Sequence, residues 1–123
     1  MHLTDVRFGE RTKNTRGELT SLSISRLAPG DRLLIGTTNS VYEFWAEYPE
    51  QAVGILRGGT IAYPTRVRLS AETAASMDAS VQPLTIGERA RVVLLGPNGN
   101  AVRGFVTSTI SRMKVDSSRV QAA

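Results

Sequence analysis

The chain has 123 residues, of which 41% are hydrophobic and 21% charged, and its formal net charge is +4. This size and composition are typical of a single soluble globular domain with a sizeable core, and they exclude both global disorder and two domains of ordinary size. Cysteine is absent, which excludes disulfide frameworks, thiolate nucleophiles and cysteine-ligated zinc.

The first 18 residues are expected to hold a short strand followed by a polar loop or arm. Residues 3–8 alternate weakly, with Val6 and Phe8 on one side, whereas residues 9–18 are polar throughout. No apolar segment here has signal-peptide length, and no later segment approaches the roughly 18 residues of a membrane span. We therefore expect a cytoplasmic protein with no membrane contact.

Residues 19–115 are expected to form a single β domain. The stretch 19–27 favours a strand with Leu22 and Ile24 on one face, while the spacing of its leucines also fits a helix. A turn at residues 29–31 is followed at once by the apolar run 33–35, which predicts a central strand.

A hairpin is expected next, because residues 41–48 alternate in polarity. The alternation places Tyr42, Phe44, Ala46 and Tyr48 on one face and Glu43, Trp45 and Glu47 on the other. Residues 49–51 predict a turn, and residues 52–57 supply the antiparallel partner.

Residues 61–69 predict a further strand, in which Pro64 indicates an edge or a bend. The following segment, residues 70–78, is the best helical candidate, with Ser70 as the cap and Glu72 in the first turn. We expect about two turns of helix here.

The clearest local pattern is a hairpin of residues 90–95 and 101–107, because Asn98-Gly99 supplies the positive φ values that tight turns require. Residues 109–115 predict a last strand, and residues 116–123 are expected to be a flexible tail. Seven or eight short strands predict an all-β, mainly antiparallel fold, a small barrel or sandwich of the SH3-like or OB-like type.

Nothing in the sequence favours catalysis, a metal or a cofactor. The single histidine, His2, lies near the start of the chain, so a Ser-His-Asp arrangement is not expected. Glu43 and Glu47 share a strand face, but a solvated strand face explains such a pair more simply than acid–base chemistry. We expect a non-catalytic binding module without a metal or cofactor.

The first interpretation is protein interaction or self-association into a homo-oligomer. If Val92, Leu94, Val102 and Val106 fill the core, then Val93, Leu95 and Phe105 form an apolar strip on the surface. Such a strip is covered either by the chain itself or by a partner.

The alternative interpretation is binding of RNA or single-stranded DNA. Outward arginines would contact phosphates and an exposed aromatic ring would stack on a base. The candidate residues are Arg57, Arg66, Arg68, Arg89, Arg91, Arg103, Trp45 and Tyr63. An enzyme with an unrecognised site is the third interpretation.

Overall fold

The protein, described here by a computed structural model that covers residues 12–13 and 18–117, is built almost wholly of β-strands. Single turns of 3-10 helix lie at Ile24–Arg26 (η1), Pro49–Gln51 (η2) and Ser76–Asp78 (η3). The strands are β1 (Thr12–Lys13), β2 (Glu18–Leu22), β3 (Arg32–Thr37), β4 (Val41–Tyr48), β5 (Val53–Gly58), β6 (Ile61–Ala71), β7 (Leu84–Thr85), β8 (Ala90–Leu95), β9 (Ala101–Val106) and β10 (Ile110–Asp116).

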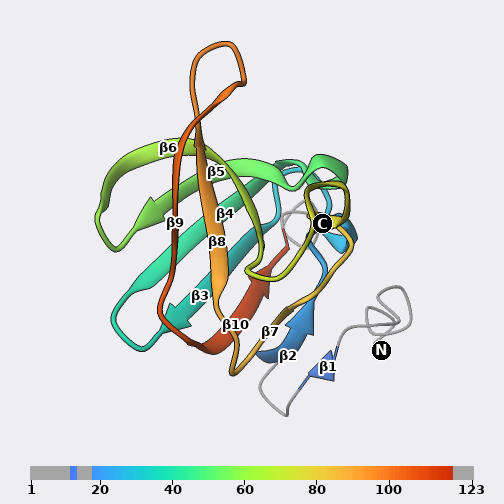
Figure 1. Ribbon diagram of the computed structural model, residues 1–123. Helices are drawn as coiled ribbons and strands as arrows, with labels where there is room; N and C mark the ends of the chain where they lie inside the picture. The colour runs from blue at the N-terminus through green and yellow to red at the C-terminus, as the bar shows by residue number, and fades with distance from the viewer. Residues whose placement is uncertain (1–11, 14–17, 118–123) are drawn as a thin grey trace.

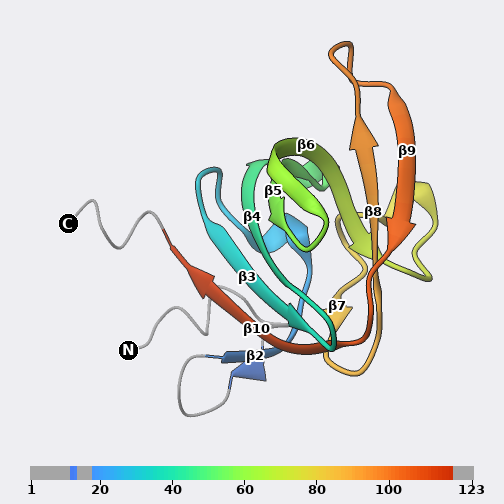
Figure 2. The same cartoon turned by 90° about the vertical axis from the view of Figure 1, so that its left-hand side faces the viewer.

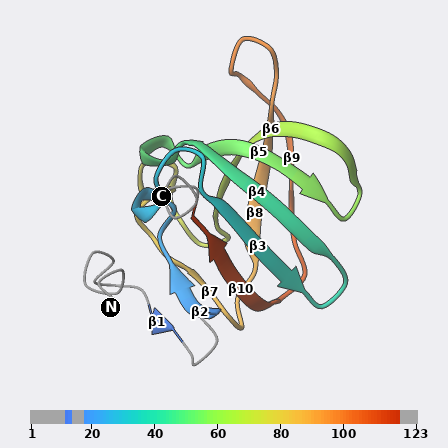
Figure 3. The same cartoon turned by 180° about the vertical axis from the view of Figure 1, so that it is seen from behind.

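Within the described residues these strands form one antiparallel sheet that curls into a half-barrel (Figures 1 and 2). The strand order is β1-β2-β10-β3-β4-β5-β6-β8-β9, and β7 pairs with β2 outside this path. Seen from behind, β10 lies between β2 and β3, although it follows both of them in the chain by many residues (Figure 3). The all-β, antiparallel fold predicted from the sequence is confirmed.

The concave side of the sheet holds the core. In β4 the alternation predicted from the sequence is observed, because Tyr42, Phe44 and Ala46 are buried and the residues between them are half-buried. Leu33 and Ile35 of β3 lie on the same side, opposite Phe44 and Tyr42. Burying such side chains stabilises the fold by about 1.5–3 kcal/mol each, so this face orients the whole sheet.

Two tyrosines depart from the predicted alternation. Tyr48 is 51% exposed, because the register between β4 and β5 shifts between Ala46 and Tyr48. Tyr63 is 80% exposed, because the first part of β6 pairs with β5 alone and extends beyond the core. The bend or edge expected at Pro64 lies in this same segment.

The prediction of a helix over residues 70–78 is wrong. Ser70 and Ala71 continue β6 and pair with Arg91 and Ala90 of β8, and the segment ends in the single 3-10 turn η3. Ala71 is buried in the core. Two turns of helix are marginal without packing, and the ladder with β8 offers both hydrogen bonds and burial.

At the N-terminal side, residues 19–27 contain both of the expected conformations in succession, since β2 ends at Leu22 and η1 follows. Thr12–Lys13 form the strand β1 inside the segment expected to be a loop. The strand expected over residues 3–8 lies outside the described residues, as do residues 118–123 of the expected tail. Asp116 of that tail is the last residue of β10.

Candidate functional site

The β8–β9 hairpin extends beyond the rest of the sheet at its tip (Figures 1 and 2). Its turn is closed by a hydrogen bond of 2.8 Å from the Gly96 N–H to the Asn100 carbonyl, and Gly99 has a φ of 83°. The hairpin predicted here is observed, but Gly99 alone supplies a positive φ and Asn98 does not, so the turn is longer than a two-residue Asn-Gly turn.

The register of this hairpin decides which side chains face the core. Val92 pairs with Phe105, Leu94 with Arg103, and Val93 with Gly104. Directly paired residues share a face. Phe105 therefore lies on the inner face with Val92, where it is half-buried against the core cluster.

The apolar strip expected from Val93, Leu95 and Phe105 is therefore not assembled on one surface. Phe105 faces inward, whereas Val93 lies on the opposite face of the sheet, and both Val93 and Leu95 are half-buried. The predicted faces of β9 were inverted, since a one-residue change of register moves every side chain to the other side. Val102 and Val106, which were expected in the core, are exposed by 69% and 39%.

The register changes by one residue within the hairpin. The pairs nearest the turn, Gly96–Asn100 and Leu95–Ala101, are centred on Asn98, whereas Val92–Phe105 and Leu94–Arg103 are centred between Asn98 and Gly99. The irregularity between Leu94 and Leu95 therefore places Phe105 on the inner face. Counting apolar residues in each strand separately does not detect such a shift.

Strand β9 has one strand neighbour among the described residues and so presents an open edge. The Thr107 N–H donates to the Ala90 carbonyl at 2.8 Å. Because hydrogen-bonding direction alternates along an antiparallel ladder, the N–H and C=O groups of Gly104 and Val106 point away from β8, toward this edge. These groups remain available for another strand.

The six predicted arginines divide into two groups. Arg57 bonds Glu43, Arg66 bonds Glu47 through two hydrogen bonds of 2.9 and 3.1 Å, and Arg89 bonds Glu72. The other three have no carboxylate partner among the described residues, and all lie on β6, β8 or β9: Arg68, Arg91 and Arg103.

The two predicted aromatic residues, Trp45 and Tyr63, lie on different strands. The Arg57 guanidinium lies 5.8 Å from the centre of the Trp45 ring, which is half-buried on the outer face of β4. Tyr63 is exposed but lies on the part of β6 that β8 does not reach. The two rings therefore belong to different parts of the surface.

The Glu47–Arg66 pair has an electrostatic signature. Its hydrogen bonds hold the pKa of Glu47 below the usual glutamate range, against a smaller opposing effect of burial, and they raise the pKa of Arg66. Both shifts follow from favouring the charged form of each partner. This pair is a structural contact on the outer face of the sheet.

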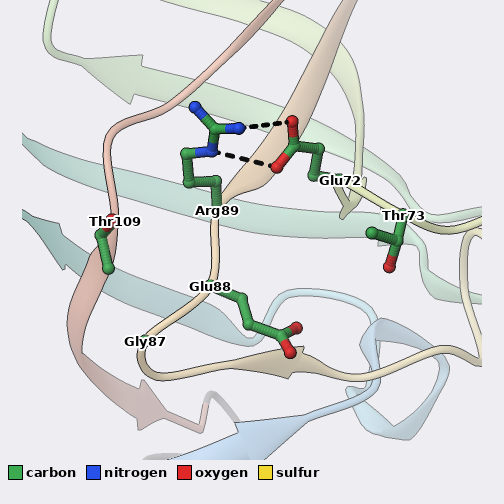
Figure 4. A pocket seen from close by; sticks show the side chains of 6 residues that line it. All are labelled: Glu72, Thr73, Gly87, Glu88, Arg89 and Thr109. Carbon is green, nitrogen blue, oxygen red and sulfur yellow. Dashed lines mark hydrogen bonds and ion pairs between the residues drawn. The ribbon is translucent and has the colours of Figure 1, made fainter.

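A pocket of about 270 Å³ lies where β6 and β8 approach the start of β10 (Figure 4). Arg89 donates two hydrogen bonds of 3.0 and 2.9 Å to the carboxylate of Glu72, and this pair forms one wall of the pocket. Glu88, Thr73 and Thr109 complete the polar lining. The carboxylate of Glu72 is committed to Arg89, so the pocket does not bring two free carboxylates together.

Comparisons with known proteins add no assignment: no protein-family model, curated protein or solved structure matches this chain. Over residues 12–13 and 18–117, no group of three His, Asp or Glu side chains is close enough to hold a metal ion. In the same residues no helix is long and apolar enough to cross a membrane.

Proposed function

We propose that this protein is a non-catalytic interaction module that binds an extended segment of another polypeptide as an additional strand on β9. The observation that carries this proposal is the open edge of β9, where backbone groups point outward beside the exposed side chains of Val102 and Val106. Added strands bind through such backbone groups, and the neighbouring side chains provide selectivity.

The composition of β9 supports this proposal. Natural sheets protect their edges with proline, lysine, bulges or very short strands. The six-residue β9 has neither proline nor lysine. Its protective features are the inward-facing Arg103 and a register irregularity at the turn end of the hairpin, which leave the edge at Gly104 and Val106 open. At the other end of the sheet, the described strand β1 has two residues.

The nucleic-acid alternative has weaker support in this geometry. Three of its six arginines are neutralised by carboxylates, and Arg57 covers the ring of Trp45. Arg91 and Arg103 lie on opposite faces of the hairpin, since Arg103 pairs with the inward Leu94 and Arg91 does not share that face. A phosphate backbone also cannot use the outward backbone groups of β9 as a ladder.

The proposal is tested by selecting binders from a displayed library of random dodecapeptides and mapping them by amide chemical shifts. Selected peptides are expected to shift the resonances of β9. Val106→Pro removes one outward N–H and places a ring on the edge, so binding should weaken by about tenfold or more, equivalent to about 1.4 kcal/mol.

The matched control is Val106→Thr, which keeps the N–H and the branched side chain and should keep most of the affinity. Peptides that bind Val106→Pro as well as the parent protein, or that shift resonances elsewhere in the sheet, contradict the proposal.

A further inference from the structure

Within the described residues, most arginines of this sheet are paired with carboxylates, and the three that are not lie on β6, β8 and β9. Four strand arginines each hold a carboxylate, namely Arg32, Arg57, Arg66 and Arg112, and so does Arg89, which directly precedes β8. Arg68, Arg91 and Arg103 hold none among the described residues. The three arginines without a carboxylate thus lie on the open strand and on the two strands next to it in the sheet order, while Lys114 of β10 is a separate cation without a carboxylate among the described residues.

From this charge distribution, and resting on the proposed function, we infer that the strand bound by β9 is acidic. The inference names the partner class: an extended peptide with carboxylates on both of its faces. Arg103 and Arg91 are the residues that select it, one on each face of the hairpin.

On the inner face, Arg103 meets the added strand directly. A residue opposite Arg103 has its Cβ about 4.5–5.5 Å away, within reach of a carboxylate. An ion pair there gains charge-assisted hydrogen bonds at a partly covered surface. A carboxylate at this position is therefore favoured over a neutral or basic side chain.

On the outer face, Arg91 lies one strand further in. Arg91 pairs with Val106, and an added residue opposite Val106 is two strand spacings, about 9.5 Å, from Arg91. The long side chains of arginine and glutamate together span that distance over the valine. Glutamate is therefore expected at this second position.

Gly104 lies between these two positions, and a Cβ there would lie 2.9 Å from the Val92 carbonyl oxygen and 3.5 Å from Val93 Cγ2. It pairs with Val93, which is half-buried, and it contributes no side chain of its own. A large apolar residue opposite Gly104 can reach over the glycine toward Val93 and lie beside Val106. The favoured partner has a glutamate opposite Val106 and any residue opposite Phe105. It then has an apolar residue opposite Gly104 and an acidic residue opposite Arg103.

A second copy of this chain fits the same edge less well. Two β9 strands related by a two-fold axis at Gly104 would pair Val102 with Val106 of the other copy, a favourable contact. However, β9 contains no carboxylate, and this pairing places the two copies of Arg103 diagonally across the new ladder. The arginines would remain uncompensated, so the charge distribution favours an acidic peptide.

The test uses blocked octapeptides of sequence TVETVETV, TVQTVQTV and TVKTVKTV, measured by fluorescence anisotropy at low salt. The acidic peptide should bind about tenfold or more tightly than the glutamine peptide, and the lysine peptide should bind most weakly. The double variant Arg91→Gln/Arg103→Gln should remove the advantage of the acidic peptide. The double variant Arg57→Gln/Arg112→Gln, which has the same net charge, should retain it.

Different outcomes separate the two proposals. Equal binding of the acidic and glutamine peptides, both weakened by Val106→Pro, overturns the acidic partner and leaves the edge intact. Acidic binding that is insensitive to Val106→Pro overturns the edge itself, and so does the failure of all three peptides together with the dodecapeptide library.

Two further measurements on the same preparation test for other occupants, a second copy of this chain and a nucleic acid. A dimer seen by sedimentation that Val106→Pro abolishes assigns the edge to a second copy and overturns the acidic partner. Displacement of the acidic peptide by a dodecamer of single-stranded DNA at equal concentration would assign the arginines to phosphate and also overturn it.

Discussion

The β3–β4–β5 region and the β8–β9 hairpin belong to the same sheet but differ in how many side chains are buried and how many arginines are paired. In β3, and in β4 as far as Ala46, every second residue is buried, and each outward arginine has a carboxylate on a neighbouring strand. In β9 five of six residues are exposed, and Arg103 has no such partner. The first region maintains the fold, whereas the second has exposed residues and an arginine without a carboxylate partner in the described part of the chain.

This difference separates stability from recognition. The hydrophobic core and the paired charges concentrate free energy where the sheet has neighbours on both sides. The hairpin is anchored on one face by Ala90, Val92, Leu94 and Phe105, and most of β9 is available to solvent. Changes in the two regions should therefore have effects of different size on unfolding and on binding.

The largest expected effect comes from emptying the core. Phe44 is fully buried and Phe105 is half-buried. Phe44→Ala should lower the free energy of unfolding by about 3–5 kcal/mol, and Phe105→Ala by no more than about 2 kcal/mol. Urea denaturation of both variants measures the contrast, and equal losses would show that the hairpin is as tightly integrated as β4.

Moving a proline by one residue tests the direction of the β9 backbone groups. Phe105→Pro removes an N–H that faces β8 and leaves its acceptor on β8 without a donor, so it should cost about 1–3 kcal/mol. Val106→Pro removes an outward N–H and should cost less than about 1 kcal/mol. Thermal unfolding followed by circular dichroism compares the two, and a larger loss for Val106→Pro would reverse the assigned direction.

A glycine in the core region gives the next effect. A Cβ at Gly54 would overlap the Trp45 carbonyl and lie 2.6 Å from Phe44 Cζ, whereas one at Gly36 meets only the Arg112 side chain at 3.5 Å. Gly54→Ala should cost about 1–3 kcal/mol or more. Gly36→Ala, the control, should change stability by about 0.5 kcal/mol or less. Similar values from chemical denaturation would mean that β4 and β5 separate easily.

The smallest effect concerns the Glu47–Arg66 pair, whose two side chains are 31% and 45% exposed. Glu47→Gln should cost about 0.2–1 kcal/mol at neutral pH and low salt. Because the folded protein holds the pKa of Glu47 below its unfolded value, this contribution is complete above the ordinary glutamate pKa. It should disappear as the pH falls through the lowered folded pKa. A difference between parent and variant that grows in acid would contradict this assignment.

The β4–β5 hairpin shows what local sequence can predict. The strict alternation from Tyr42 to Ala46 and the turn at Pro49 are local signals, and each is observed. The helix expected at residues 70–78 failed because Ala71 has a distant partner, Ala90, that no local pattern reveals. Propensity is a weak guide where a ladder with a distant strand decides the conformation.

The candidate site needed two facts that local sequence reasoning did not supply. The first is the register of β8 and β9, which an irregularity between Leu94 and Leu95 shifts by one residue. The second is the strand order, which makes β9 an edge and leaves Arg103 without a carboxylate. Ion-pair partners such as Glu43, shared by Arg32 and Arg57, also depend on strand order.

The position of β10 between β2 and β3 has a consequence for biosynthesis. Ribosomes extend a chain from its N-terminus, so β2 and β3 emerge long before the strand that joins them. Until Ile110–Asp116 has been translated, β3 lacks its β10 neighbour and the nascent chain displays a second unpaired strand border. Because β10 pairs with strands that lie so far from it in the sequence, we expect this topology to fold slowly. We also expect the nascent chain to need protection against premature aggregation.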